Sequence, residues 1–472
     1  MMPEITLSLT GAQHRALREH LFPGDGKEAV AIVLCGRRAG VERHRLLARS
    51  LHLVPHEQCS LRSPVTMAWP TDIMVPWLQD ADRRGLSIVK VHSHPGNYQR
   101  FSGQDDRSDA DLFPCIAGWI EAEVPHASVV MLPDGRMFGR TVDNDGRFGS
   151  LDTISVVGDD LLIWHTDEFD TIQEKLLLPA FTRRHAQAFG ASTTRRLGRI
   201  TAAVIGCSGT GSIVIEQLVR LGIGRLVIVD DDIVKYLNLN RILNATAADA
   251  AQGRSKVEMT AAAIERIGLG TVVERFTSSL STPAAVRAVA GCDVIFGCVD
   301  TVEGRFVANL IANFYIIPYI DVGVALDADD AGKITQVCGY IHYLQPGASS
   351  LISRGAISME DVRAEGLKRQ NPGYYEEQRR AGYIRNVHED RPAVISVNTV
   401  LAGMAVNELL ARLHGFRDEP NADYATIGVS ISQVLFYPER ESGIPCKIMA
   451  RHVGRGDVIP LLEQAELSED QA

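Results

Sequence analysis

Residues 201–230 of the chain read TAAVIGCSGTGSIVIEQLVRLGIGRLVIVD and predict the fold of its larger part. Thr201–Ile205 is an apolar, strand-forming run. Three glycines follow it: Gly206, Gly209 and Gly211. A helical pattern begins at Ser212, and a second apolar run ends in the acid Asp230. Strand, glycine turn, helix and strand in this order are typical of a parallel α/β domain whose first turn binds a nucleotide phosphate.

The residues from Asp230 onward indicate which family of nucleotide-binding domains the chain resembles. Residues 230–241, DDDIVKYLNLNR, resemble the Asp-x-Asp-x-Val-x-x-x-Asn-Leu-x-Arg segment of ubiquitin-activating enzymes, a superfamily that includes the bacterial ThiF and MoeB adenylyltransferases. The resemblance continues at residues 253–256, GRSK, and at residues 298–305, CVDTVEGR. It implies a Rossmann-like α/β domain with a mainly parallel sheet that uses ATP and Mg²⁺ to adenylate the C-terminal glycine of a ubiquitin-like protein.

The resemblance also implies a role for individual residues. Asp230 would bind the ribose, Arg241 and Lys256 the phosphates, and Asp300 the magnesium ion, with Asn238 near the phosphates. Asp232 would support the loop, although a plain surface acid is an alternative. Arg183 lies where the family keeps an arginine that reaches across a homodimer, and a solvated basic helix face is its alternative.

A second motif lies far upstream, in residues 86–105, LSIVKVHSHPGNYQRFSGQD. Because residues i and i+2 of a strand share a face, His92 and His94 can present two imidazoles to one ion, and Asp105 can return as an anionic ligand. Two nitrogens and one carboxylate, with a fourth position left to water, suit a catalytic zinc site. Zinc lowers the pKa of its water to roughly 7, which makes a nucleophile for amide cleavage available at neutral pH.

The full string resembles the JAMM (JAB/MPN) metalloprotease motif, His-[Ser/Thr]-His-Pro-x6-Ser-x-x-Asp, at every fixed position. The resemblance implies an α/β metalloprotease domain that cleaves after the C-terminal glycine of ubiquitin-like proteins. Zinc would be held by His92, His94 and Asp105, with Ser102 stabilising the tetrahedral intermediate. Glu28 stands where the family places its general base, and an exposed carboxylate at a strand start is the alternative.

Composition limits the class of protein. The chain has 472 residues, of which 45% are hydrophobic and 22% charged, which predicts a globular protein of at least two domains. A net charge of −10 argues against a nucleic-acid surface. Eight scattered cysteines give no disulfide framework, and the chain shows neither a signal peptide nor a transmembrane run, so we expect a cytoplasmic enzyme with no membrane partner.

We expect a JAMM domain over residues 1–150, a helical connector over 151–195 and a ThiF-like domain over 196–460. Residues 355–390 form a polar, charged stretch, which we interpret as a mobile crossover segment. Many relatives carry a transfer cysteine after the sixth or seventh strand, whereas this chain has Ser350 and Ser353 there. Direct transfer from the adenylate, an unusual hydroxyl nucleophile and cysteines replaced by engineering remain open.

The joint hypothesis is a bifunctional enzyme of a bacterial ubiquitin-like modification pathway, which processes or deconjugates the modifier and then activates it. A homodimer and a conjugating enzyme are the further partners considered. The first alternative is activation of a sulfur-carrier protein for cofactor or cysteine biosynthesis. The second is a scaffold with an inactive activating domain, and an NAD-dependent dehydrogenase ranks last because no hydride-transfer residues accompany the glycine turn.

Overall fold

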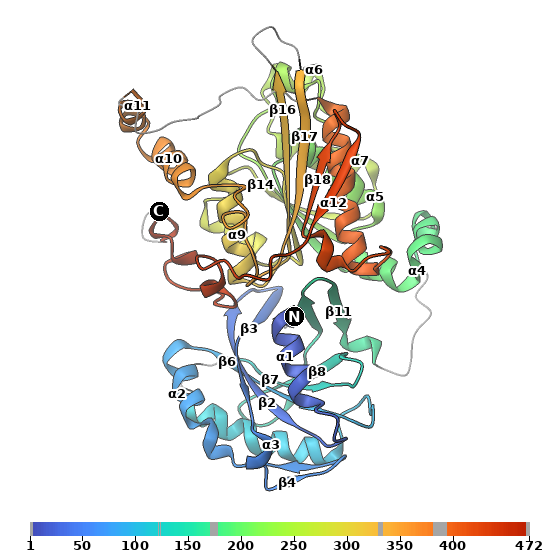
Figure 1. Cartoon of the computed structure of the whole chain (residues 1–472), viewed down its shortest axis with the longest axis vertical. Coiled ribbons are helices and arrows are strands. Elements are labelled where there is room, and N and C mark those ends of the chain that lie inside the picture. The colour runs from blue at the N-terminus through green and yellow to red at the C-terminus, as the bar shows by residue number, and fades with distance from the viewer. Residues whose placement is uncertain are drawn as a thin grey trace. The chain divides into compact units, whose positions relative to one another are not determined.

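The protein is described by a computed structural model that covers residues 3–120, 122, 124–169, 178–328, 334–380 and 394–468. It divides into two compact units. The first consists of Met1–Leu176, Phe314–Ile316 and His452–Val458, and the second of Leu177–Asn313, Ile317–Arg451 and Ile459–Ala472. Each unit contains one large sheet with helices packed on it (Figure 1). Within the described ranges, no helix is both long and apolar enough to span a bilayer.

The sheet of the first unit has nine strands in the order β11-β10-β1-β3-β2-β6-β7-β8-β9. Its strands are β1 (Glu4–Thr10), β2 (Val30–Arg38), β3 (Arg43–Leu53), β6 (Ser87–Ser93), β7 (His126–Met131), β8 (Met137–Val142), β9 (Phe148–Ser150), β10 (Thr153–Val157) and β11 (Leu161–His165). A separate two-stranded ribbon pairs β4 (Leu61–Arg62) with β5 (Met67–Ala68). The helices are α1 (Gly11–Leu21), α2 (Val75–Arg84) and α3 (Gly103–Trp119).

The central strands of this sheet are β2 and β6, and both are buried on both faces; β2 begins with the apolar run VAIVLC, whereas β6, SIVKVHS, also buries polar side chains. One hydrophobic cluster packs α2 and α3 against them, with Ile32 and Ile88 from the strands, Leu78 from α2 and Phe113 from α3. The apolar runs of the sequence predict strands at 28–36, 86–93, 127–132 and 136–141, and β2, β6, β7 and β8 lie within two residues of these ranges. The chain turns between β7 and β8 at Asp134–Gly135, as predicted.

Residues 153–165 differ from the helical connector that the sequence predicted. They form β10 and β11, which extend the sheet of the first unit: β10 pairs in parallel with β1, and β11 pairs antiparallel with β10. The register places Thr153 opposite Thr6. The alternation in TISVV and LLIWH is a strand signal, but both runs are short, and only the exposed edge of β1 gives them a partner.

The second unit holds an eight-stranded sheet in the order β14-β13-β12-β15-β16-β17-β18-β19. Its strands are β12 (Thr201–Ile205), β13 (Arg225–Val229), β14 (Val272–Phe276), β15 (Val294–Gly297), β16 (Tyr319–Ala328), β17 (Ile334–Leu344), β18 (Thr426–Ser430) and β19 (Leu435–Glu439). The strands from β14 to β16 are parallel, and β17, β18 and β19 are added antiparallel. The predicted α/β class with a mainly parallel sheet is confirmed.

The helices of this unit are α4 (Arg183–Leu197), α5 (Gly209–Leu221), α6 (Ala247–Gln252), α7 (Lys256–Ile267), α8 (Pro283–Val289), α9 (Val302–Phe314), α10 (Met359–Gln370), α11 (Pro372–Arg380) and α12 (Ile395–His414). Figure 1 shows α5 and α7 on one side of the sheet and α9 on the other, and α12 packs beside α5. The strand order reverses direction between β12 and β15. In open parallel sheets, ligands bind at such a point, beyond the carboxyl ends of the strands.

Short 3-10 turns complete the chain: η1 (His56–Gln58), η2 (Thr71–Met74), η3 (Thr166–Glu168), η4 (Ala180–Thr182), η5 (Tyr236–Asn238), η6 (Asn421–Tyr424), η7 (Ala450–His452), η8 (Leu461–Glu463) and η9 (Ala465–Leu467). The stretch 355–390, predicted as a mobile crossover segment, contains α10 and α11. Its remaining part, from residue 381 onward, lies outside the described residues.

Candidate functional sites

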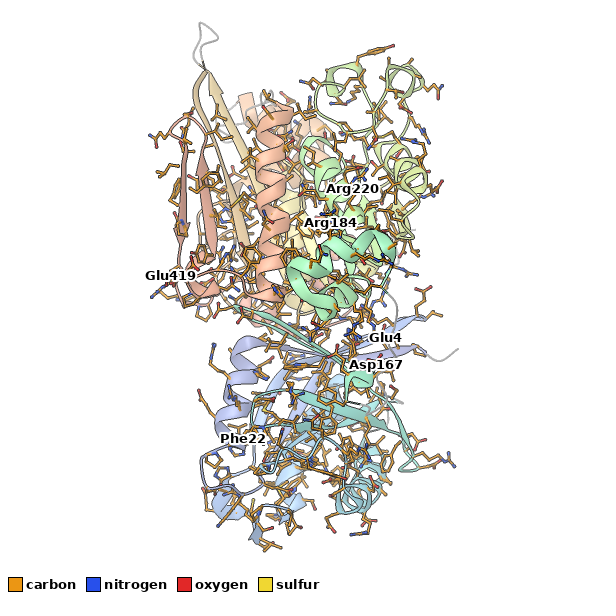
Figure 2. The ribbon with its side chains drawn as sticks, turned by 90° about the vertical axis from the view of Figure 1, so that its right-hand side faces the viewer. Glu4, Phe22, Asp167, Arg184, Arg220 and Glu419 are labelled. Carbon is orange, nitrogen blue, oxygen red and sulfur yellow. The ribbon has the colours of Figure 1, made fainter. Side chains whose placement is uncertain are left out.

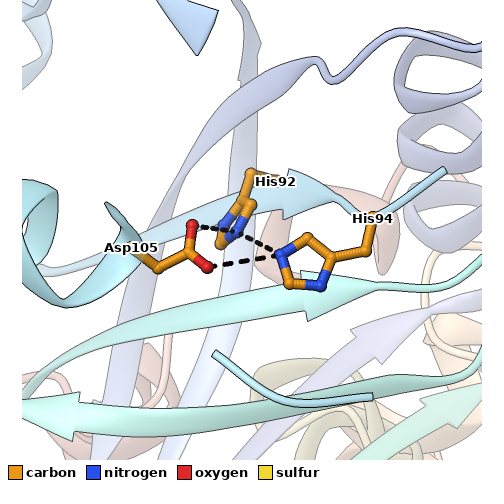
Figure 3. A group of neighbouring side chains, drawn as sticks. All are labelled: His92, His94 and Asp105. Atoms are coloured by element: carbon orange, nitrogen blue, oxygen red, sulfur yellow. Dashed lines mark hydrogen bonds and ion pairs between the residues drawn. The ribbon is translucent and has the colours of Figure 1, made fainter. Parts of the chain in front are cut away.

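Three candidate metal ligands converge in the first unit, at the end of β6. His92 and His94 alternate with one residue between them and point to the same side of the strand, and Asp105 faces them from the first turn of α3 (Figure 3). His92 Nε2 lies 3.1 Å from Asp105 Oδ1, and His94 Nε2 lies 3.4 Å from Asp105 Oδ2. The two Nε2 atoms are 3.2 Å apart. All three side chains are buried.

These distances can be tested against the geometry of a zinc ion. Bonds of roughly 2.0–2.1 Å to a tetrahedral centre would separate neighbouring ligand atoms by about 3.3 Å. The two histidine nitrogens, 3.2 Å apart, have about this separation. Asp105 lies 3.1 Å from His92 through Oδ1 and 3.4 Å from His94 through Oδ2, and one donor atom from each of the three residues lies within 4.8 Å of the others. Two imidazole nitrogens and one carboxylate oxygen are also the donor types that zinc accepts in catalytic sites. The residues present therefore fit a zinc ion that keeps one position open.

The hydrogen bonds of the Nδ1 atoms determine which ring nitrogens of His92 and His94 are available to a metal. His94 Nδ1 lies 2.7 Å from the Tyr98 carbonyl oxygen, so it donates its proton there and leaves Nε2 as the free lone pair. His92 Nδ1 is buried and finds no hydrogen-bond partner among the described residues. Tyr98 was missed in the sequence because it acts through its backbone, which carries no residue-type signal.

The electrostatics of the three groups follow from burial and from their mutual contacts. Burial lowers the pKa of His92. Burial also acts to lower the pKa of His94, but hydrogen bonds to Asp105 and to the Tyr98 carbonyl raise it above its ordinary value. Burial opposes ionisation of Asp105, yet its hydrogen bonds with both histidines hold its pKa well below the usual range. Asp105 is thus an anion and His92 a neutral base, the forms that bind a metal.

Ser102 and Glu28, the predicted catalytic side chains, have different environments. Ser102 is the N-cap of α3: its hydroxyl donates to Asp105 Oδ2 at 2.6 Å and accepts from the Asp105 amide at 3.1 Å. Glu28 lies two residues before β2 and is only 8% exposed, so the alternative of an exposed carboxylate is not what the structure has. Burial raises the pKa of Glu28 to about 7; the charge of His94 opposes this shift, and the charge of Asp105 adds to it.

The glycine turn of the second unit lies between β12 and α5. A Cβ at Gly211 would stand 1.8 Å from the Gly206 carbonyl oxygen, so no larger residue fits there. Gly206 has φ +93, and a Cβ on it would meet the Cys298 carbonyl oxygen at 2.6 Å. The first amides of α5 follow directly, and its N-cap Ser208 makes no side-chain capping bond. A helix N-terminus with uncapped amides beside a tight glycine turn fits a phosphate group.

Asp230 stands at the carboxyl end of β13 and is tied to the glycine turn. Its Oδ2 accepts from the Cys207 amide at 2.7 Å and its Oδ1 from the Asp232 amide at 2.9 Å. Burial raises the pKa of Asp230, against the opposing influence of Lys256. Lys256, which begins α7 and is almost fully buried, places Nζ 2.7 Å from Asp232 Oδ2 and 3.8 Å from Asp230 Oδ1. Asp232 thus orients the lysine, which is more than a plain surface acid would do.

The other predicted nucleotide residues surround this turn or stand apart from it. A Cβ atom added to Gly209 would lie 3.1–3.2 Å from the Cδ and Cγ atoms of Arg241, so the side chain of Arg241 packs against the glycine turn. Asn238 is buried, and its Oδ1 accepts from the Lys235 amide. Asp300 is exposed at the carboxyl end of β15. Arg183 is exposed at the start of α4, and its neighbour Arg184 is labelled in Figure 2.

Two residues near the predicted nucleotide residues were missed in the sequence, one beside Gly209 and one near Asp300. Asn398, on α12, packs its Nδ2 against Gly209, 2.3 Å from the position of a Cβ there. Glu365, on α10, accepts a 2.8 Å hydrogen bond from the Glu303 amide and so caps the N-terminus of α9. Burial raises the pKa of Glu365, and the nearby carboxylates of Glu303 and Asp300 raise it further. Neither residue stands out in the sequence, because Asn398 lies between the polar residues Ser396 and Thr399 at the start of α12 and Glu365 lies in a charged helix.

The serines that replace the expected cysteine close a turn after β17. Ser350 is fully buried, and its amide donates to Ser353 Oγ at 2.8 Å while its Oγ accepts from the Ser353 amide at 3.3 Å. Of the cysteines beyond Asp300, Cys338 and Cys446 are both buried. The hydroxyl of Ser350 is thus engaged in a reciprocal turn that shields it from solvent.

Comparisons with known proteins match both parts of the chain. A sequence model of the ThiF family matches residues 182–436, more than half of the chain. A model described as prokaryotic homologs of the JAB domain matches residues 11–138. Both resemblances predicted from the sequence are thereby confirmed.

Similar proteins include ubiquitin-like modifier-activating enzyme 5 of Drosophila pseudoobscura pseudoobscura, 30% identical over 184 residues, which cover 36% of this chain and 44% of that protein. The Arabidopsis thaliana enzyme of the same name is 27% identical over 195 residues, 36% of this chain and 43% of that protein. The chain thus spans less than half the length of these relatives.

Among solved structures, Escherichia coli MccB with ATP is 16% identical, covers 59% of this chain and 76% of that one, and has a TM-score of 0.43. A structure of PaaA is 17% identical, with 57% and 86% coverage and a TM-score of 0.40.

Proposed function

The chain belongs to the ThiF family, and we propose that it is an enzyme with two active sites that serve one ubiquitin-like protein. In this proposal the first unit is a zinc-dependent peptidase that trims the ubiquitin-like protein or releases it from a target. The second unit then adenylates the C-terminal glycine with ATP and Mg²⁺. The observation that carries the proposal is the buried cluster of His92, His94 and Asp105, whose donor atoms lie within 4.8 Å of one another, in a chain that also has the ThiF nucleotide turn.

The peptidase half of the proposal assigns a task to each group around the three ligands. His92, His94 and Asp105 would hold the zinc ion, which would supply a Lewis acid for the scissile carbonyl. Glu28 accepts a proton from the attacking water and returns it to the leaving amine, for which a pKa of about 7 is well matched. Ser102 orients Asp105 through its 2.6 Å hydrogen bond and offers a hydroxyl beside the reacting carbonyl.

The adenylation half rests on the groups around the glycine turn. The amides at the start of α5 bind phosphate oxygens, and the cations Arg241 and Lys256 reduce the repulsion between the triphosphate and an incoming carboxylate. Asp230 receives the ribose hydroxyls. Asp300 holds the magnesium ion, which supplies charge neutralisation for the departing pyrophosphate.

We propose that the adenylate is passed on without a cysteine thioester in this chain. This is supported by Ser350, whose hydroxyl is buried in its turn, and by the burial of Cys338 and Cys446. A serine hydroxyl ionises far above neutral pH and would need an adjacent base to act in place of a thiolate. The acceptor is then an external nucleophile: a target amine, a separate conjugating enzyme, or sulfide.

The same feature favours the second candidate, activation of a sulfur-carrier protein, because sulfide can attack an adenylate directly. The two candidates differ in their product. Incubation with ATP, sulfide and a small partner protein gives a thiocarboxylate, detected by its mass, only in the sulfur-carrier case.

The test of the main proposal combines two measurements on the full chain. Zinc content after purification measures the first unit, and ATP–pyrophosphate exchange in the presence of candidate ubiquitin-like proteins measures the second. Bound zinc together with partner-dependent exchange supports the proposal. A chain that binds no zinc and exchanges pyrophosphate with no partner contradicts it and leaves the scaffold alternative.

We also propose that the second unit acts as a homodimer in which Arg183 reaches the nucleotide of the other copy. Its exposure at the start of α4 leaves it available for this contact. Light scattering gives the oligomeric state. Mixing an Arg183→Ala chain with an Asp300→Ala chain should then restore part of the exchange activity that each lacks alone.

A further inference from the structure

A cluster of buried charges lies beside the three candidate metal ligands and has no task in the proposed chemistry. Lys90, on β6, is 4% exposed, and Asp109, on α3, is fully buried. The ammonium group of Lys90 pairs with Asp109 Oδ1. Arg140, on β8, binds the other oxygen of Asp109, with Nη2 at 2.7 Å and Nε at 3.2 Å.

The cluster repeats the arrangement of the metal ligands one step further along the same two elements. Lys90, His92 and His94 alternate along β6 and therefore share one face of the strand. Asp105 and Asp109 are four residues apart on α3 and share one face of the helix. The strand and helix are thus joined twice, once through the ligands and once through Lys90 and Asp109.

Arg140 connects this second link to the loop that leads into α3. Its Nη1 lies 2.5 Å from Asp106 Oδ1, and its guanidinium carbon lies 3.9 Å from the ring centroid of Phe101. Phe101 directly precedes Ser102, the N-cap residue, and its ring centroid is 6.4 Å from that of His92. One arginine therefore contacts both the entry to α3 and its second turn.

Stability alone does not account for such a cluster. Burying charges carries a large desolvation penalty, and well-packed apolar residues of similar size often give equal or greater stability. Apolar contacts have no preferred direction. A guanidinium group that donates hydrogen bonds from several nitrogens, by contrast, fixes the rotation and register of the carboxylates that it binds. Metal ligands must be placed to within about 0.2 Å, so a small slide of α3 along β6 would separate Asp105 from the histidines.

We propose that Lys90, Asp109 and Arg140 are positioning residues that set the affinity and geometry of the metal site by fixing α3 in register with β6. The inference rests on the proposed zinc site and concerns residues that do not touch the metal. Groups that hold metal ligands in place typically change metal affinity 10- to 100-fold when they are removed.

The test replaces the ion pair by apolar residues in the full chain, with the double variant Lys90→Met/Asp109→Leu. We expect its metal-free form to unfold at nearly the parent temperature, whereas its affinity for Zn²⁺, measured by competition with a chelator, falls about 10- to 100-fold. The visible absorption of the Co²⁺-loaded protein should also change, because it reports ligand geometry. A folded double variant with parent-like affinity and spectrum would overturn the inference.

A second variant guards against failure of the first to fold. Arg140→Lys keeps the charge but loses the planar fork and the stacking on Phe101, and we expect a several-fold loss of Zn²⁺ affinity with an altered cobalt spectrum. Parent behaviour in Arg140→Lys would likewise count against the inference. The matched control is Arg147→Lys, because Arg147 is 75% exposed and pairs only at the surface with Asp145.

The parent chain separates this inference from the proposed function. If the parent binds no Zn²⁺ or Co²⁺, the zinc site itself is refuted and the inference falls with it. If the parent binds and the variants bind equally well, the inference alone fails. ATP–pyrophosphate exchange should be the same in parent and variants, because none of the three residues belongs to the second unit.

Discussion

Glu28 shows how the surroundings of one carboxyl group prepare it for proton transfer. Its pKa is raised by burial from an ordinary 4.5 to about 7, so it is half ionised near neutral pH. We expect cleavage to decline as the pH falls through about 7, because only the ionised form accepts a proton. Glu28→Gln should reduce cleavage about 10²- to 10⁴-fold at all pH values. Rates of cleavage of a ubiquitin-like precursor between pH 5 and 9 check this, and an unchanged rate in the variant would remove Glu28 from the mechanism.

The same raised pKa predicts an effect on the stability of the metal-free protein. The folded state binds the proton of Glu28 more tightly than the unfolded state does, so this contribution is complete below about pH 4.5 and is lost as the pH rises to about 7. The Glu28→Gln variant has no carboxyl group to ionise at this position, so it should not show this loss of stability. Urea unfolding at pH 5 and pH 8 should therefore show a smaller decline for the variant than for the parent, and an equal decline would contradict the assignment.

Gly211 is a second residue whose task follows from its surroundings. A methyl group there would stand 1.8 Å from the Gly206 carbonyl oxygen, so Gly211→Ala must displace the glycine turn. We expect ATP binding to weaken by at least about tenfold, since the amides of α5 would no longer face the phosphates. Gly373→Ala is the control, because a Cβ there meets no atom closer than 3.8 Å. Calorimetric titration with ATP distinguishes the two, and equal affinities would refute this role for the turn.

At the scale of single residues, motif spacing predicted that His92, His94 and Asp105 come together, as they do in the structure. Their role as metal ligands and the nucleotide roles of the glycine turn and Asp230 stay predictions. Motif spacing could not predict Tyr98, Asn398 or Glu365. The first contributes a backbone carbonyl, and the other two reach their sites from helices that are distant in the sequence. Such contacts depend on tertiary packing, which a local pattern does not encode.

Among the elements, α3 both caps its own N-terminus and carries the candidate metal ligand Asp105. Ser102 and Asp105 form a reciprocal capping box at this end. Ser102→Ala should lower the free energy of unfolding of the metal-free protein by about 1 kcal/mol and also weaken zinc binding, because Asp105 loses its 2.6 Å hydrogen bond. Ser102→Thr keeps the cap and should restore most of both. Denaturant unfolding and zinc competition measure the effects, and a threonine variant no better than alanine would argue against this coupling.

The elements that the sequence predicted best are those with strong local signals. The strand, turn and helix from β12 to β13 lie within about three residues of the prediction, because apolar runs and glycines mark their ends. Residues 153–165 and α10 were assigned differently. β10 exists through pairing with β1, and β11 through pairing with β10. α10 buries none of its residues and is held by contacts such as Glu365 with α9 and Arg369 with Glu303.

The whole molecule consists of two units, each of which contains one complete candidate site. His94→Ala should therefore reduce precursor cleavage by at least about 100-fold and leave pyrophosphate exchange unchanged. Asp300→Ala should reduce exchange by a similar factor and leave cleavage unchanged. Assaying both activities on both variants checks this independence. Loss of both activities in either folded variant would show that the sites are coupled.

The pairing of β10 with β1 bears on how the peptidase half can be produced alone. A fragment that stops at residue 150 ends before β10, so the amides and carbonyls of β1 that face Thr153–Val157 lose their partners. An unpaired edge of this kind recruits other chains and promotes aggregation. A fragment extended through residue 169 retains both added strands, and its recovery in soluble form should exceed that of the shorter one.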